Sequence, residues 1–212
     1  QDEAAQLVSL FAAGDLRGKG GRVLDACAAP GGKTFHLAQL LGERGEVVAI
    51  EVHPRKAEEL RAEADRRGLG ARVRVVCADA ARPVPGLEPG SFDAVLVDAP
   101  CTGLGTLRRH PELKLRRGPE DPARMAEVQR ALLAACAAYA REGAPVTYSV
   151  CSLTRAEGPA VAAWAVAHGL RRTPPPPGFP ADVLTAEGDL LTLPSRHGCD
   201  GFYAARLVAV PG

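Results

Sequence analysis

Residues 25–34 form a run of small residues, Asp-Ala-Cys-Ala-Ala-Pro-Gly-Gly-Lys-Thr, whose types and spacing suit the binding of a small molecule. Pro30–Gly32 put little side chain between the backbone and a ligand, and a helix beginning there offers free N–H groups. The apolar pair Val23 and Leu24 precedes the run, and leucines at helical spacing follow it. This order predicts a strand, a tight loop and a helix, and open α/β sheets bind ligands at such strand ends.

Two familiar interpretations of a glycine loop fail on spacing. A phosphate-binding Walker A loop needs glycine five positions before the Gly-Lys-Thr, and that position is Cys27. The dinucleotide fingerprint needs G-x-G-x-x-G, whereas the loop has only the adjacent pair Gly31 and Gly32. A plain structural turn stays open as the alternative for this stretch taken alone.

Three acids stand at the ends of consecutive predicted strands: Glu51, Asp79 and Asp98. An acid after the second strand of a doubly wound fold binds ribose hydroxyls, and one after the third can accept from an adenine amino group. Each acid taken singly suits the capping of a helix equally well. Their occurrence together with the glycine loop favours a nucleoside-containing cofactor.

The elements that must position these residues alternate along the chain. Apolar runs predict strands at 22–25, 46–51, 72–77, 92–98, 144–150 and 201–210. Helical spacing predicts helices at 2–11, 35–41, 54–67, 122–141 and through Trp164. This alternation predicts an α/β fold with βαβ units and a mainly parallel sheet.

The composition narrows the class of protein. A chain of 212 residues with net charge +1 fits one domain and neither requires nor excludes nucleic acid. No long apolar run or signal peptide is visible, so we expect no membrane partner. The six cysteines lack metal-ligand spacing, which predicts no metal site and a reducing, cytoplasmic location. Because the chain opens at Gln1 and holds one methionine, we expect a fragment of a longer protein.

Five motifs follow one another over nearly the whole chain. They are Asp25–Thr34, Asp98-Ala-Pro-Cys101, Arg108-Arg-His-Pro111, Tyr148-Ser-Val-Cys-Ser152 and Asp200-Gly-Phe-Tyr203. Together they resemble the RNA (cytosine-5)-methyltransferases of the RsmB/Fmu (Sun), Nop2 and NSUN group, and the Arg-Arg-His-Pro segment is most similar to the RsmB branch.

The resemblance implies an S-adenosylmethionine-dependent enzyme that methylates small-subunit ribosomal RNA. It also implies a class I, Rossmann-like methyltransferase sheet, doubly wound and mostly parallel, with an antiparallel last strand. We expect residues 1–212 to be a single catalytic domain, monomeric, and to lack the upstream RNA-binding domain of that branch.

The resemblance also implies a role for each residue of the predicted cofactor site. Glu51 would hold the ribose, Asp79 the adenine edge, and Asp98 would lie between cofactor and base. The cofactor's methionine end would lie against Cys27, Ala28, Ala29, Pro30, Gly31, Gly32 and Lys33.

The chemistry of cytosine methylation accounts for the cysteines. Carbon 5 is a poor nucleophile until a thiolate adds to carbon 6, which requires a cysteine as covalent catalyst. By resemblance Cys151 is the nucleophile, Cys101 helps product release, and Lys33 tunes the Asp98 carboxyl that would hold a proton at N3. Because DNA enzymes of similar chemistry use the Pro-Cys cysteine, the exchanged assignment stays open. We expect Cys77, Cys136 and Cys199 to be structural.

A basic segment beside the predicted site suits contacts with RNA phosphates. It holds a single acid, Glu112, among six basic or imidazole side chains: Arg108, Arg109, His110, Lys114, Arg116 and Arg117. A solvated loop is the alternative for this segment.

Three other functions compete with this prediction. An amino-group methyltransferase would carry Asn/Asp-Pro-Pro-aromatic where Asp98-Ala-Pro-Cys101 stands. A catalytically inactive cofactor- and RNA-binding module that assists ribosome assembly predicts loss of a cysteine or of the glycine loop. A nicotinamide-dependent oxidoreductase lacks its glycine spacing.

Overall fold

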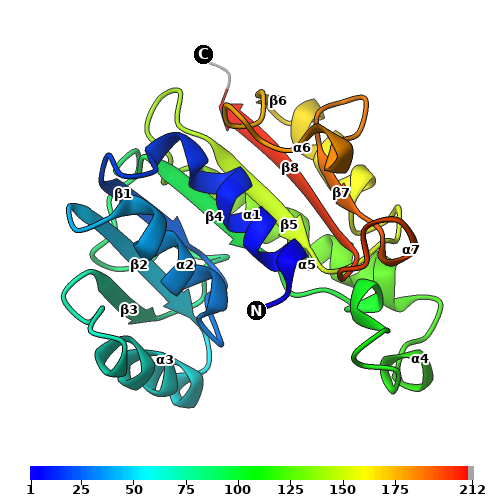
Figure 1. Ribbon diagram of the computed structural model, residues 1–212, viewed down its shortest axis with the longest axis horizontal. Coiled ribbons are helices and arrows are strands. Elements are labelled where there is room, and N and C mark those ends of the chain that lie inside the picture. The colour runs from blue at the N-terminus through cyan, green and yellow to red at the C-terminus, as the bar shows by residue number, and fades with distance from the viewer. Residues whose placement is uncertain (210–212) are drawn as a thin grey trace.

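One mixed sheet of eight strands runs through residues 1–209, the part of the chain that this computed structural model describes (Figure 1). Its order is β3-β2-β1-β4-β5-β8-β6, with β7 paired to β8. The strands are β1 (Gly21–Asp25), β2 (Gly45–Glu51), β3 (Val73–Cys77), β4 (Ala94–Asp98), β5 (Val146–Val150), β6 (Leu170–Arg172), β7 (Leu190–Thr192) and β8 (Phe202–Ala209). Neighbours among β1 to β5 are parallel, and β8 is antiparallel to β5. The predicted fold class is confirmed.

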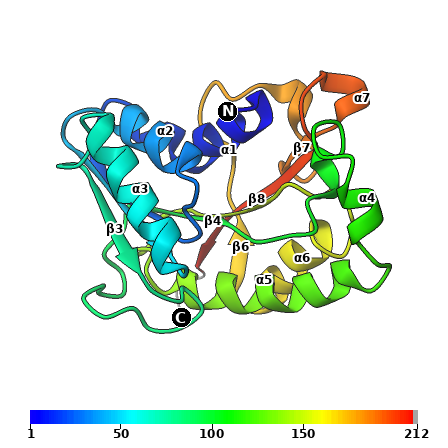
Figure 2. The same ribbon diagram turned by 90° about the horizontal axis from the view of Figure 1, so that it is seen from below.

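Helices cover both faces of the sheet, with α1 and α2 on one face and α5 and α6 on the other (Figure 2). The α-helices are α1 (Glu3–Ala13), α2 (Gly32–Leu41), α3 (Pro54–Arg66), α4 (Leu113–Arg116), α5 (Asp121–Ala137), α6 (Pro159–Ala167) and α7 (Pro194–His197), with short 3-10 turns at Gly14–Leu16, Leu104–Thr106 and Ala181–Val183. Two hydrophobic cores result, one on each face. Because both faces of the sheet are covered, β4 is a continuous apolar run up to Asp98. In contrast, β5 alternates apolar side chains with the buried hydroxyls of Thr147 and Ser149.

The helix expected over 122–141 is shorter in the structure, because α5 ends at Ala137. The Tyr139 carbonyl accepts from Phe92 N at 3.0 Å, and Arg141 N donates to the Phe92 carbonyl at 2.9 Å. Residues after the helix therefore pair with the segment that leads into β4 instead of continuing the helix.

Two short strands lie beyond the sequence prediction. β6 and β7 have three residues each and pair antiparallel with β8, and three residues are too few to show a hydrophobic period. The strand expected at 201–210 is β8, and Val210 lies outside the described residues.

The carboxyl ends of β1, β2, β3, β4 and β5 meet at one edge of the sheet because these strands are parallel. The strand order reverses between β1 and β4, which is the place where doubly wound folds bind ligands. Among the described residues, no helix is long and apolar enough to cross a membrane.

Shortening a core side chain of the central sheet tests this packing. Leu96 of β4 is 0% exposed, so Leu96→Ala is expected to lower the free energy of unfolding by about 2–5 kcal/mol through lost burial and a cavity. Leu115 of α4 is 89% exposed, and Leu115→Ala serves as the control, with a change within about 0.5 kcal/mol. Urea denaturation measures both, and equal losses would contradict the core assignment.

Candidate active site

The glycine loop connects β1 to α2 and depends on Gly31. Gly31 has φ +103°, and a Cβ there would lie 2.5 Å from both Leu60 Cδ1 and Phe35 Cε2. The loop is tied to the neighbouring strand because Ala28 N donates to the Ile50 carbonyl at 2.9 Å. A side chain at position 31 would therefore displace the loop from the sheet edge.

All three predicted strand-end acids, Glu51, Asp79 and Asp98, line one cavity of about 670 Å³. Two of them are held by backbone donors: His53 N donates to Glu51 at 2.9 Å, and Ala81 N donates to Asp79 at 2.9 Å. The exposed side chain of Val52 and residues of α5 complete the walls. We call this space the acid-lined cavity.

A second cavity of about 650 Å³ lies on the side of the loop nearer α1 and α2. Lys33, Arg109 and Phe202 line it, together with the first residues of α1. We call it the lysine-lined cavity. Among the predicted loop residues, Cys27 and Ala29 line both cavities, and Gly31 lines neither. The remaining four line only the lysine-lined cavity of the two: Ala28, Pro30, Gly32 and Lys33.

Asp98 and Cys151 also line both cavities, so these two groups lie where the cavities meet. The Asp98 carboxylate is held from two sides, by Lys33 Nζ at 2.6 Å and by the Ser149 hydroxyl at 2.6 Å. Burial lowers the pKa of Lys33, but its contact with Asp98 outweighs burial and the pKa lies above its usual value. The ammonium also lies 5.0 Å from the centre of the Phe202 ring.

The two cysteines after β4 and β5 face each other. The sulfur atoms of Cys101 and Cys151 are 3.2 Å apart, and both residues are half-buried. A hydrogen bond from the Cys101 S–H to the Cys151 sulfur lowers the pKa of Cys151, and the same bond raises the pKa of Cys101. Cys151 is therefore the thiol that is more readily ionised, and ionised thiols are the nucleophilic ones.

The other cysteines lie elsewhere. Cys136 is fully buried on α5, and burial raises its pKa to about 12. Cys199 is buried, and Cys77 is exposed at the end of β3. Within residues 1–209 no group of three or more His, Cys, Asp or Glu side chains is placed to hold a metal ion.

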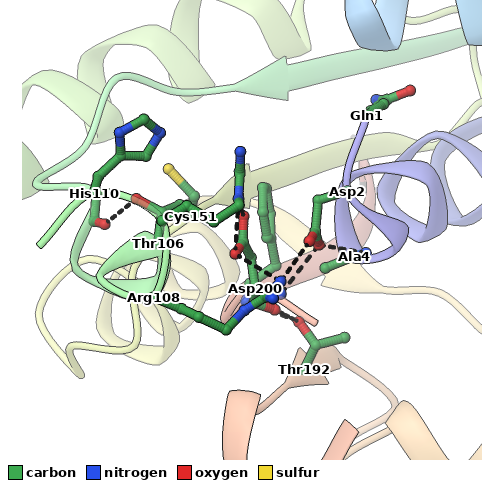
Figure 3. Close-up of polar contacts among 12 residues, drawn as sticks. Gln1, Asp2, Ala4, Thr106, Arg108, His110, Cys151, Thr192 and Asp200 are labelled. Carbon is green, nitrogen blue, oxygen red and sulfur yellow. Dashed lines mark hydrogen bonds and ion pairs between the residues drawn. The ribbon is translucent and has the colours of Figure 1, made fainter. Parts of the chain in front are cut away.

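The predicted RNA-binding segment divides into paired and unpaired side chains. Asp200, which is fully buried, accepts from Arg109 Nε at 2.9 Å and lies 3.6 Å from Arg108 Nη2. Arg108 also bonds Asp2 at 3.1 Å, and Figure 3 shows Asp2, Arg108 and Asp200 converging. These two arginines are thus held by carboxylates and fix the segment against α1 and β8.

The rest of the segment differs. His110 pairs with Glu112 at 3.4 Å, and Arg117 Nε donates to the Thr102 carbonyl at 3.0 Å. Lys114 and Arg116 lie exposed on α4, and no described residue forms an ion pair or side-chain hydrogen bond with them. They are the members whose charge is available to a ligand.

Phe202 was missed as a site residue, although it belongs to the Asp200–Tyr203 motif. Its ring borders the lysine-lined cavity beside Lys33. The motif itself was the signal, but its spacing did not show which of its side chains would face the cavity.

A family model described as "16S rRNA methyltransferase RsmB/F" matches residues 17–208. The ribosomal RNA small subunit methyltransferase B of Thermus thermophilus is 44% identical over 200 residues, which are 94% of this chain and 48% of that protein. The probable ribosomal RNA small subunit methyltransferase B of Bacillus subtilis is 36% identical over 194 residues, covering 85% of this chain and 41% of that protein. The chain thus spans about half the length of the curated relatives it matches.

Among solved structures, NSun6 from Pyrococcus horikoshii with SFG is similar over 100% of this chain and 53% of its own. The TM-score is 0.84 at 27% sequence identity. A second structure from the same organism, a methyltransferase homolog protein, has a TM-score of 0.80 at 29% identity, covering 99% of this chain and 67% of its own.

The pH dependence of stability tests the environment of Asp25, which ends β1. Its side chain is buried and accepts from the Thr34 hydroxyl at 2.7 Å, and burial raises its pKa from 3.8 to about 6. Because the folded state keeps a proton that the unfolded chain has released, stability falls as the pH rises from about 4 to about 6. The Asp25→Asn variant cannot lose this proton, so its free energy of unfolding is expected to fall by about 3 kcal/mol less than that of the parent over the same pH range.

Urea denaturation of the parent chain and the Asp25→Asn variant at several pH values measures the difference. Other groups titrate in both proteins, so the parent serves as the reference at each pH. Parallel curves between pH 4 and 7 would mean that Asp25 is not protonated in the folded state near pH 5.

Proposed function

Because the chain belongs to the RsmB/F family of 16S rRNA methyltransferases, we propose that it transfers a methyl group to carbon 5 of a cytosine in small-subunit ribosomal RNA through a covalent cysteine–cytosine adduct. The membership confirms the family that the sequence motifs predict. S-adenosylmethionine is the methyl donor, as predicted for this family, and when bound it supplies an electrophilic methyl group.

The observation that carries the proposal is the meeting of two cavities at Cys151 and Asp98. The acid-lined cavity fits the donor, because Glu51 and Asp79 offer carboxylates for a ribose and an adenine, and the small loop residues Cys27 and Ala29 line it. The lysine-lined cavity is left for the target nucleotide. This changes the expectation for the loop, because only Cys27 and Ala29 of its predicted donor-binding residues line the donor's cavity, whereas Ala28, Pro30, Gly32 and Lys33 face the nucleotide. A base there can contact a thiol while its other side faces the donor.

Cys151 is the nucleophile in this proposal. Its thiolate forms a bond to carbon 6, and the electron pair of the 5,6 double bond then makes carbon 5 nucleophilic. After carbon 5 has taken the methyl group, a base removes the carbon 5 proton and the carbon–sulfur bond breaks, returning the thiolate. Cys101, 3.2 Å away, holds the S–H that stabilises this thiolate and assists product release.

Asp98 and Lys33 handle the charge on the cytosine ring. The attack on carbon 6 builds negative charge toward N3, and the Asp98 carboxyl lies in the wall shared by both cavities. Lys33 and Ser149 fix that carboxyl in place, so it can hold a proton at N3 without reorganising. A cation against the helix dipole at the start of α2 is disfavoured, and its contact with Asp98 offsets that cost.

The basic segment is the proposed RNA contact, and its side chains have different roles. Lys114 and Arg116 on α4 offer charge to phosphates, whereas Arg109 lines the lysine-lined cavity and is fixed by Asp200. The target base must leave its stack to enter that cavity, which is easiest in an RNA loop.

Trapping with RNA that contains 5-fluorocytosine tests the roles of the cysteines. Fluorine at carbon 5 blocks the final proton removal, so the protein–RNA adduct accumulates. Cys151→Ala is expected to abolish both the adduct and methylation, whereas Cys101→Ala still forms the adduct and releases product slowly. Cys77→Ala is the control, because its sulfur lies outside both cavities.

The opposite result would exchange the roles: an adduct in Cys151→Ala and none in Cys101→Ala. The target is tested separately by bisulfite sequencing of ribosomal RNA from cells with and without the intact gene. An unchanged methylcytosine map would reject the ribosomal substrate.

The salt dependence of RNA binding tests the basic segment. Replacing Lys114 and Arg116 together by alanine is expected to reduce the slope of log affinity against log salt by about 0.7 for each lost phosphate contact. Arg171→Ala is the control, because Arg171 is exposed on β6 at the far edge of the sheet. If the double variant has the same slope as the control, the RNA phosphates contact another surface of the protein.

A further inference from the structure

A buried carboxylate connects the two loops that carry the cysteines. Glu157 lies between β5 and α6 and is 0% exposed. One oxygen accepts from Thr102 N at 2.7 Å and from Gln129 Nε2 at 3.2 Å. The other accepts from the hydroxyls of Thr102 at 2.5 Å, Ser152 at 2.6 Å and Thr154 at 3.0 Å.

Two of these donors are the direct sequence neighbours of the two cysteines. Thr102 directly follows Cys101, and Ser152 directly follows Cys151. The carboxylate of Glu157 therefore holds the residue next to each cysteine, one after β4 and one after β5. Gln129 on α5 adds a further bond at 2.9 Å to the Pro100 carbonyl on the other side of Cys101.

We propose that Glu157 is a positioning residue that sets the separation of the Cys101 and Cys151 sulfurs by holding Thr102 and Ser152. This inference rests on the proposed function, because the separation matters to catalysis only if both thiols act on one base. Glu157 acts through the loops and lines neither cavity.

Stability alone is a poor reason for this carboxylate. Five hydrogen-bond donors reach its oxygens, but within the described residues no cation pairs with Glu157. Burying a carboxylate away from any cation is costly. The hydroxyls of Thr102 and Ser152 already lie 3.3 Å apart, so a smaller neutral residue at 157 would leave them able to bond each other. What such a residue would not provide is one rigid acceptor shared by both loops.

The thiol pair reports this spacing directly. Cys101 donates its S–H to Cys151 across 3.2 Å, and that bond lowers the pKa of Cys151. If the loops move apart, the bond weakens and the Cys151 thiol returns to ordinary or higher pKa. The pH at which Cys151 becomes reactive is thus a measure of the position of the two loops.

The experiment is the pH profile of iodoacetamide alkylation at Cys151, followed by mass spectrometry of the intact chain in the absence of RNA and cofactor. Glu157→Ala is expected to move the midpoint for Cys151 upward, to ~8.5 or above, the value of an unperturbed thiol. Glu157→Gln keeps the shape of the side chain and one acceptor oxygen. Its midpoint for Cys151 is expected to stay close to that of the parent chain.

A matched control separates positioning from loss of stability. Asp189 is a second buried carboxylate, which accepts from Arg172 at 2.9 and 3.0 Å and from the Tyr203 hydroxyl, and it bonds neither cysteine, nor Thr102 or Ser152. Asp189→Ala is expected to destabilise the fold and to leave the Cys151 midpoint unchanged.

A folded Glu157→Ala variant with the midpoint of the parent would overturn the proposal. If Glu157→Ala does not fold, Ser152→Ala removes the bond from Ser152 to Glu157, together with the contacts of the Ser152 hydroxyl with Thr102 and Thr154. It must move the midpoint in the same direction or the proposal fails. The alkylation assay uses neither RNA nor cofactor, so it does not depend on methylation activity. If the parent chain failed to methylate RNA, the proposed function would be contradicted, and the Cys151 midpoints would still test the role of Glu157.

Discussion

The parallel pairing of β4 with β5 is the constraint on which the site depends. It places Asp98 opposite Ser149, and their side chains bond at 2.6 Å. Cys101 follows Asp98 by three residues, and Cys151 follows Ser149 by two. Both cysteines therefore lie at the same edge of the sheet. A slip of one residue would turn the apolar set of β5 away from its core and separate the thiols.

The charges of the site depend on that geometry. Lys33 and Asp98 are both largely removed from water, and each has the other as its partner at 2.6 Å. Asp25 lies nearby without a cation of its own, which is why burial raises its pKa. The site therefore places two carboxyl groups, Asp25 and Asp98, around the single ammonium of Lys33. This arrangement lowers stability and favours groups that can bind or release a proton.

Much of the site could be predicted because strand ends converge. Parallel strands bring Glu51, Asp79 and Asp98 to one edge regardless of side-chain detail, and the same reasoning places Cys101 near Cys151. The glycine loop was predictable because an apolar strand segment precedes Pro-Gly-Gly and leucines at helical spacing follow it.

Other features depend on contacts that no local pattern records. Arg109 meets Asp200 across 91 positions of sequence, so a carboxylate of the protein already pairs with its guanidinium group. Glu157 stands in a turn, where an acid is ordinarily solvated, and only the packing of two loops buries it. The division of the loop between two cavities likewise depends on which way each small side chain faces.

The two cavities have a geometric consequence. They lie on different sides of the β1–α2 loop, one against α1 and α2 and the other against α3 and α5, and they share only Cys27, Ala29, Asp98 and Cys151. Most of the lining of each cavity therefore belongs to that cavity alone, and two molecules bound in them would meet only at these four residues. A substitution at any other lining residue would alter one cavity and spare the lining of the other.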